Sequence, residues 1–214
     1  MRNLVEKDVV LHQLLENGVH LGHHKNKWNA EMSSYLLGIR SKTHIIDLEK
    51  TLVSLRKAMS LVQNVSSHGG KILFISTIPE FSHIIEMAAK KAGQPYINRR
   101  WIGGLLTNFT EIRKKLTNLK GCSHKFIYST QGIRSMSTLP DMIFVIGINN
   151  CTTALHEASL LNIPCIGIVD SNTSVQNVTY PIPGNDDSIL AVNLYCQLIS
   201  NAILSGSYHS IYQD

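Results

Sequence analysis

The residues best able to do chemistry near the start of the chain are three closely spaced histidines: His20, His23 and His24. Imidazole is a common metal ligand, and the carboxylate of Asp47 or Asp170 could complete a metal site. The spacing His-x-x-His-His matches no strong signature such as His-Glu-x-x-His, however, and the neighbouring Lys25 and Lys27 would repel a cation. Residues 19–28 are predicted to form a His- and Lys-rich loop, and histidines that order this loop, or that contact a nucleic acid, are therefore the preferred interpretation.

A second candidate is the acidic pair Asp186-Asp187, at the end of the run Tyr180–Asp187. Paired carboxylates can act in catalysis or hold magnesium. No second carboxylate cluster lies nearby in the sequence, and Gly184 and Asn185 permit a tight turn before an apolar segment. The preferred interpretation is that Asp186 or Asp187 caps a helix.

Gly103-Gly104, after Trp101, could form a phosphate-binding loop. The chain has no G-x-G-x-x-G after a strand, no G-x-x-x-x-G-K-[ST] and no nucleophile elbow of the form G-x-S-x-G. The two glycines are better explained by a sharp turn of the backbone. An enzyme that binds a phosphorylated small molecule is kept as the alternative function.

Basic residues and tryptophans form the remaining set, in three groups: Lys25, Lys27 and Trp28; Arg99, Arg100 and Trp101; and Arg113, Lys114, Lys115 and Lys120. Lysine and arginine neutralise phosphates, and planar side chains stack on unpaired bases. For Trp101, next to Ile102, anchoring in the core is as good an interpretation as base stacking.

The distribution of charge supports binding to a polyanion. The net charge is +5, but all 20 Lys and Arg lie before residue 141, where the balance is +11. Residues 141–214 carry six acids and no Lys or Arg. Such clustering is typical of nucleic-acid-binding proteins, so we expect the part of the chain before residue 141 to make nearly all contacts with the nucleic acid.

The four cysteines form no close pair, and Cys151, Cys165 and Cys196 lie in apolar stretches. We expect buried free thiols in a reducing compartment. No run of about 18 apolar residues predicts a membrane span. The N-terminal ten residues are too acidic for a typical cleavable presequence and lack the apolar core of a secretory signal.

Strands and helices are predicted to alternate along one α/β domain that covers residues 1–214. Strands are expected at 43–48, 71–77, 96–98, 142–147 and 164–170. Helices are expected at 11–16, from 48 to 69, and at 77–92, 108–119, 153–161 and 187–204. Asp47 and a Thr77–Glu80 capping box should begin two of these helices. Residues 120–138 are predicted to form a linker. The last helix is apolar nearly all round, so we expect it to be largely buried. The pattern predicts a doubly wound, mostly parallel sheet with helices on both faces, and such sheets bind ligands at the carboxyl ends of their strands.

Five motifs together resemble a known family, the bacterial-type small-subunit ribosomal protein two. They occur in the family's order at Val19–Met32, His44–Thr51, Asn98–Phe109, Leu139–Asp141 and Tyr180–Asp187. The resemblance covers about residues 11–206 and implies a flavodoxin-like domain near the junction of head and body on the solvent side of the small subunit. It implies contacts with ribosomal RNA and neighbouring proteins, and neither catalytic activity nor a cofactor. By matching position it adds Asn108 to the RNA-binding candidates: Lys25, Lys27, Trp28, Arg99, Arg100, Trp101, Asn108, Arg113, Lys114 and Lys115.

The chain departs from the family pattern in two ways. Bacterial members carry a long helical hairpin after the basic helix, whereas here only residues 120–131 separate Leu119 from Gly132. We therefore expect a shortened linker at 120–138 without a coiled coil. The turns Ile78–Glu80 and Asn149–Cys151 lack the charge that is usual in the family. Loss of the hairpin favours an organellar ribosome. Since plastid members usually keep the hairpin, we expect a mitochondrial ribosome, with a plastid or the bacterial cytoplasm as alternatives. The missing presequence would then mean synthesis inside the organelle or an uncleaved internal signal.

Overall fold

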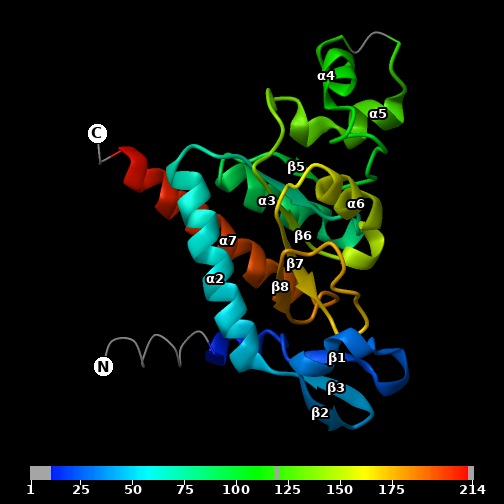
Figure 1. Ribbon diagram of the computed structural model, residues 1–214, viewed down its shortest axis with the longest axis vertical. Coiled ribbons are helices and arrows are strands. Elements are labelled where there is room, and N and C mark those ends of the chain that lie inside the picture. Colours follow the sequence, from blue (N-terminus) through cyan, green and yellow to red (C-terminus); the bar gives the residue numbers. More distant parts are fainter. Residues whose placement is uncertain (1–10, 119–120, 212–214) are drawn as a thin grey trace.

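A five-stranded parallel sheet forms the centre of the molecule (Figure 1). The computed structural model describes residues 11–118 and 121–211, with side chains as far as Tyr208. The strands are β4 (Ile72–Ile75), β5 (Tyr96–Ile97), β6 (Met142–Val145), β7 (Cys165–Val169) and β8 (Tyr180–Pro183). Their order is β5-β4-β6-β7-β8, and every neighbouring pair is parallel. The predicted parallel sheet is confirmed.

Helices cover both faces of this sheet, as predicted. On one face lie α2 (Leu48–Ser67), α3 (Ser82–Lys91) and α7 (Ile189–Ile211), and on the other α4 (Phe109–Thr117) and α6 (Thr152–Leu160). Strand β4 shows why two layers form, since Ile72 and Phe74 enter the first core and Leu73 and Ile75 enter the second. All four are fully buried, because alternate side chains of a strand point to opposite faces.

The strand order creates a switch point at the carboxyl edge of the sheet. β4 lies between β5, the next strand along the chain, and β6, the strand after that. The loops after β4 and β6 therefore diverge to opposite faces and leave a crevice between them, where open α/β sheets bind ligands. Loops after all five strands lie along this edge.

A second, antiparallel sheet precedes the parallel one. It contains β1 (Leu21–His24), β2 (Leu36–Arg40) and β3 (Thr43–Ile46) in the order β1-β3-β2. The expected strand at 43–48 is thus present, but it pairs outside the main sheet. The expectation of a loop at 19–28 was wrong, because residues 21–24 form strand β1 and pair with β3. The short turn η1 (Lys25–Lys27) follows this strand. η2 (Ala30–Tyr35) then leads to β2.

The segment expected to be a shortened linker has local structure of its own. It contains the six-residue helix α5 (His124–Ser129) and the turn η4 (Gln131–Ile133), and no long helical pair forms among the described residues 121–138. Ile133 and Met136 are buried in the core beside α4, and Phe126 packs against it. These apolar contacts hold the segment against the domain (Figure 1, top).

Two predictions about helix starts have different outcomes. Asp47 caps α2, since its Oδ1 accepts a 3.0 Å hydrogen bond from the amide of Glu49. The Thr77–Glu80 capping box is wrong, because the Thr77 hydroxyl donates to the carbonyl of Asn150 at 3.2 Å instead. Pro79 begins the short turn η3 (Pro79–Phe81), which leads into α3.

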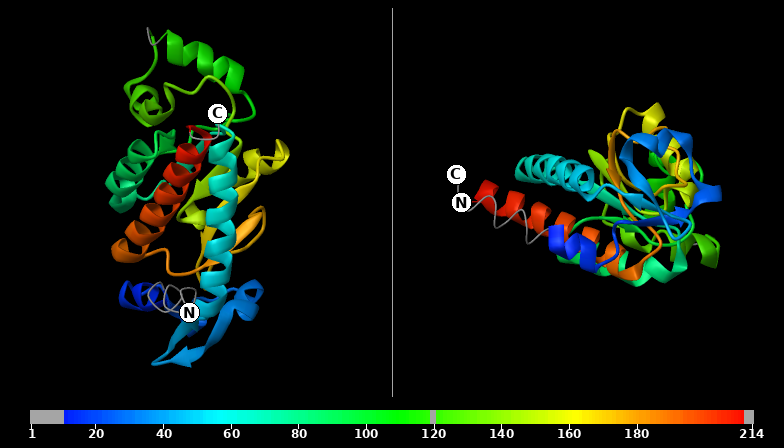
Figure 2. Two further views of the ribbon diagram at one scale, coloured as in Figure 1. Left: turned by 90° about the vertical axis from the view of Figure 1, so that its left-hand side faces the viewer. Right: turned by 90° about the horizontal axis from the view of Figure 1, so that it is seen from below.

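The last helix, α7, was expected to be largely buried because it is apolar nearly all round. It packs beside α2 and α3 and contributes Tyr195, Cys196 and Ile199 to the core (Figures 1 and 2). By length and composition residues 189–208 could also cross a membrane, but half of that stretch is buried inside the domain, and core packing accounts for its apolarity. Cys151, Cys165 and Cys196 are buried and free, as predicted, and burial raises the pKa of the Cys196 thiol to about 12.

Candidate nucleic-acid interface

The predicted Arg99, Arg100 and Trp101 lie in the loop after β5, at the switch point. There they line a cavity of about 780 Å³ together with residues from the loops after β4 and β6 and from α5. We call this the switch-point cavity; it is lined by Thr77, Pro79, Ser82, Asn98, Arg99, Arg100, Trp101, Lys125, Tyr128, Ser129, Asn150 and Thr153. The topology thus brings one predicted basic group to the place where open α/β sheets bind ligands.

The electrostatics of the switch-point cavity suit an anion. Its lining includes three cations, Arg99, Arg100 and Lys125, and no carboxylate. Arg100 and Lys125 are exposed, and within the described part of the chain neither forms an ion pair. The Arg99 guanidinium carbon lies 3.5 Å from the centre of the Tyr128 ring, a cation–π contact that fixes both groups at the mouth of the cavity.

Trp101 does not offer a face for base stacking, so that part of its prediction is corrected. Its side chain is 8% exposed, and its indole N–H donates to Glu157 Oε1 at 2.9 Å. The same carboxylate accepts from the amides of Gly104 at 2.8 Å and Leu106 at 2.9 Å. Trp101 therefore shapes the loop, because hydrogen bonding to a buried carboxylate fixes it against α6. Gly104, at φ +80°, makes the predicted sharp turn.

Helix α4 carries the third predicted group. Phe109, Ile112 and Leu116 are buried, and this leaves an exposed side: Arg113, Lys114 and Lys115. Lys114 pairs with Glu111 at 2.7 Å, which partly offsets its charge. Asn108, at the start of the helix, is exposed, and its side chain makes no capping bond. These groups are free to contact phosphates.

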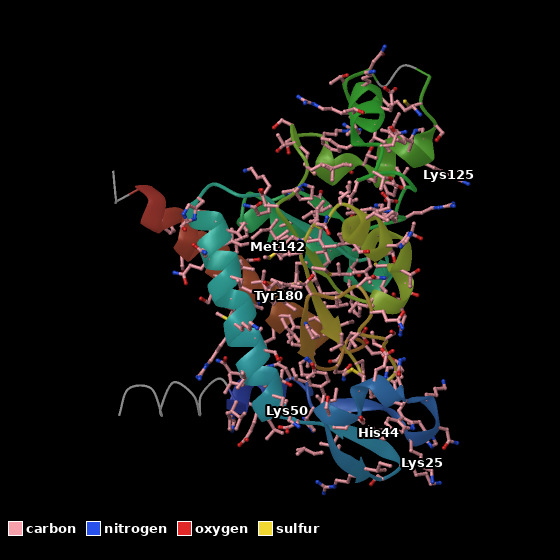
Figure 3. All side chains as sticks on the ribbon, in the orientation of Figure 1. Lys25, His44, Lys50, Lys125, Met142 and Tyr180 are labelled. Atoms are coloured by element: carbon pink, nitrogen blue, oxygen red, sulfur yellow. The ribbon has the colours of Figure 1, made fainter. Side chains whose placement is uncertain are left out.

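The first predicted group lies far from the other two. Lys25 and Lys27 belong to η1, and Figure 3 shows Lys25 and Lys125 at opposite ends of the long axis, near the same side of the view. Trp28 is 44% exposed, and its ring lies 5.3 Å from that of His44 at a tilt of 33°. The predicted residues therefore form two separate basic regions rather than one patch.

Of the three histidines, only His23 joins other chemically active side chains. Its Nδ1 lies 3.2 Å from Asp170 Oδ1 and its Nε2 lies 3.1 Å from Asp187 Oδ2. Asp186 is also buried beside Asp170, and we call these four residues the His23 cluster. His20 stays outside it, and the Nδ1 of His24 caps η1 by accepting from the amide of Asn26 at 3.3 Å.

The predicted cap by Asp186 or Asp187 was wrong. Among the described residues neither carboxylate accepts from an amide of α7, and Asn185 Oδ1 accepts from the amides of Asp187 at 2.9 Å and Ser188 at 3.2 Å in the turn just before the helix. Asp187 reaches His23 instead, and the other side of the same imidazole faces Asp170, which directly follows β7. This supplies the second carboxylate that the sequence did not place beside the pair.

Electrostatics in the His23 cluster is dominated by buried negative charge. Asp170 is 1% exposed and Asp186 is 6% exposed. Burial, together with the charge of Asp170, raises the pKa of Asp186 to about 7. The hydrogen bond with Asp170 raises the pKa of His23 above its ordinary value and outweighs burial. A protonated His23 between two carboxylates therefore compensates part of their charge.

The His23 cluster also contains the residues best placed to hold a metal among those described. Ligand atoms of His23, Asp170 and Asp187 all lie within 4.8 Å of one another. A protonated imidazole can donate to a carboxylate from each ring nitrogen, whereas the neutral ring can accept at Nε2 from Asn172 Nδ2, which lies 3.1 Å away. The cluster also ties β1 to the main sheet, where the His23 amide donates to Ser171 Oγ at 2.8 Å.

Three residues important to this interface were missed from the sequence. Glu157 could have been noticed because Ala154 and Ala158 predict that its side of the helix is buried, and a buried acid needs partners. Lys125 and Tyr128 had no comparable signal, because they lie in the segment that was expected to be an irregular linker.

Comparison with known proteins decides between the possible families. A model of the family described as ribosomal protein S2 matches residues 14–127 and 117–206. The chain belongs to the ribosomal protein S2 family. The small ribosomal subunit protein uS2 of Acidiphilium cryptum is 41% identical over 221 residues, covering 93% of this chain and 86% of that protein. Its counterpart in Gluconobacter oxydans is also 41% identical, over 93% of this chain and 83% of that protein.

A third member, the uS2 protein of Rhodospirillum centenum, is 39% identical and covers 92% of this chain and 84% of its own length. These S2 relatives are bacterial, so the bacterial type expected from the motifs is confirmed. The two parts of the family match meet at residues 117–127, where the segment expected to lack the hairpin begins.

Proposed function

We propose that this chain is a structural, non-catalytic component of the small ribosomal subunit that binds ribosomal RNA and neighbouring ribosomal proteins. Membership of the ribosomal protein S2 family is the observation that carries this proposal. The alternative of an enzyme acting on a phosphorylated small molecule is not favoured by that membership. Sedimentation tests it, because the protein should migrate with small subunits in a gradient and should be lost from that peak after ribonuclease treatment.

RNA contact is assigned to two regions. One consists of Lys25, Lys27 and Trp28 on and after η1, and the other of Arg99, Arg100, Asn108, Arg113, Lys114 and Lys115 at the opposite end of the molecule. All are exposed except Arg99, which is half-buried, and cations in such positions can neutralise phosphates. Trp101 keeps a part in this proposal only through the shape of its loop.

Binding to small-subunit RNA should depend strongly on salt. If about six phosphates are neutralised, affinity should fall roughly a thousandfold between about 50 and 200 mM monovalent salt, because bound counterions are released on association. Fluorescence anisotropy with a labelled fragment of small-subunit RNA gives this measurement. An affinity that does not change over that range would contradict an electrostatic interface.

Most RNA contacts should come from residues 1–140. Residues 141–214 carry six acids and no Lys or Arg, so phosphates repel this part of the chain. A map of the assembled subunit measures the prediction as the number of residues within hydrogen-bonding distance of RNA. A larger number from residues 141–214 would overturn the charge argument and leave the family assignment intact.

The finer part of the proposal is that the ribosome is mitochondrial. The short segment 120–138 supports it, since loss of the hairpin favours an organellar member; the bacterial relatives do not favour it over a bacterial cytoplasm. Fractionation of the source cells decides this point, because the protein should be found with small subunits from purified mitochondria. Recovery with cytoplasmic small subunits alone would exclude it.

A further inference from the structure

We infer that the switch-point cavity binds one unpaired nucleotide, with cations of its rim holding the phosphate and the Arg99–Tyr128 pair stacking on the base. This inference deepens the proposed function and depends on it, since the nucleotide is expected to belong to an RNA strand. The cavity volume of about 780 Å³ lies within the usual range of about 300 to 1,000 Å³ for small-ligand sites.

The charges of the cavity select a phosphate. Three cations and no carboxylate line it, and Arg100 and Lys125 project from different elements, the loop after β5 and helix α5. Helices α3, of ten residues, and α6, of nine, begin at the cavity, where Ser82 and Thr153 belong to the lining. Neither helix has a side-chain cap, but the Ser82 amide at the start of α3 already bonds to the carbonyl of Pro79, so only the first amides of α6 add partial positive charge.

The planar groups of the cavity select a base. Arg99 lies over the Tyr128 ring at 3.5 Å, and Tyr128 remains 50% exposed. Guanidinium planes and aromatic rings both stack on unpaired bases. Next to them, Ser129, Asn150 and Thr153 supply hydroxyl and amide groups that can hydrogen-bond to a base edge or a ribose.

These features favour single-stranded RNA over a duplex. Bases inside a helix are stacked on both faces, so only an extruded or unpaired base can reach Arg99 and Tyr128. Electrostatics alone predicts the opposite preference, since a duplex has the higher density of phosphate charge. A preference for single strands would therefore come from the cavity and not from the overall basic surface.

The test uses the full chain and three probes: a labelled unstructured RNA of about twelve nucleotides, the same RNA in a duplex, and free adenosine monophosphate. Tyr128→Leu removes the stacking ring but keeps an apolar side chain on an exposed position. We expect it to weaken single-strand binding by roughly 5- to 100-fold, as stacking of one base would predict, and to change duplex binding by less than about twofold.

A double variant tests the phosphate contacts. Arg100→Ala with Lys125→Ala should reduce the salt slope for single-stranded RNA by about 0.7, the amount expected when one phosphate is no longer neutralised. The matched control is Arg56→Ala, which removes an exposed charge from α2, outside the cavity, and should leave the Tyr128-dependent preference unchanged. Circular dichroism melts check that each variant is folded.

Several outcomes would overturn the inference. If Tyr128→Leu weakens single-strand and duplex binding equally, or changes neither, the cavity does not hold a base. Salt-dependent RNA binding by the wild type would in that case still support the proposed function. If the wild type binds neither twelve-nucleotide probe but does bind a fragment of small-subunit RNA, the cavity inference alone fails; if it binds none of these RNAs, the proposed function fails as well. If adenosine monophosphate binds in a Tyr128-dependent manner and RNA binding is unaffected by Tyr128→Leu, the ligand is a free nucleotide and assignment to RNA is wrong.

Discussion

Replacing Glu157 with glutamine should lower the free energy of unfolding by about 3 kcal/mol, the order expected when a buried charged acceptor with several partners is lost. Glu157 is 5% exposed and accepts hydrogen bonds from Trp101, Gly104, Leu106 and Thr107. Glutamine keeps one acceptor oxygen but turns its amide NH2 group toward N–H groups that can only donate. Urea denaturation at neutral pH gives the measurement.

The same substitution should change the acid limb of stability. Burial tends to raise the pKa of Glu157, but the hydrogen bonds from Trp101 and the loop amides outweigh it and hold the pKa below its ordinary value. A lowered carboxyl pKa contributes stability above the unfolded value of about 4.3, and this contribution disappears as pH falls through the folded value. The variant should therefore lose less stability than the wild type between pH values of about 5 and 3.

The control is Glu111→Gln, which removes an exposed carboxylate from α4 and should leave the urea midpoint unchanged. A Glu157→Gln variant as stable as the wild type would show that the loop after β5 does not depend on this carboxylate. Weaker RNA binding is a further expectation, because the loop carries Arg99 and Arg100.

The second large effect is expected at the His23 cluster: the wild type should be less stable at about pH 8 than at about pH 6 by roughly 1–2 kcal/mol. The raised pKa of His23 means that its ion pairs with Asp170 and Asp187 stabilise the fold at low pH and disappear as pH rises through the folded value. Asp186, with a pKa raised to about 7, acts in the same direction, because its ionised form is disfavoured in the folded state.

Asp170→Asn should reduce this pH difference without abolishing it, since the charge of Asp170 acts on both titrating groups while burial continues to raise the pKa of Asp186. Urea denaturation in buffer with EDTA measures it without bound cations. His12→Gln is the matched control, because His12 pairs with Glu16 at 3.3 Å but its side chain is 70% exposed. An unchanged pH dependence in Asp170→Asn would mean that other groups cause it.

The sequence alone determined the parallel sheet, the helices on both faces and the family. Apolar runs such as 142–147 and the stripe of α2 are local patterns, and local patterns specify strands and helices directly. The charge division at residue 141 and the five motifs are likewise properties of the chain itself, so the polyanion-binding interpretation and the family resemblance needed no coordinates.

Only the tertiary structure decided which side chains meet. Asp170 and Asp187 are 17 positions apart and His23 lies far before both, yet the ends of β7 and β8 bring them together at one edge of the sheet. Trp101 was equally compatible with stacking and with anchoring until Glu157, 56 residues away, was found to hold its N–H. Contact energies depend on distances between segments remote in sequence, and spacing along the chain does not contain those distances. For the same reason, Lys125 and Tyr128 lie in a segment without a clear period, and only the position of α5 beside the loop after β5 makes them part of the switch-point cavity.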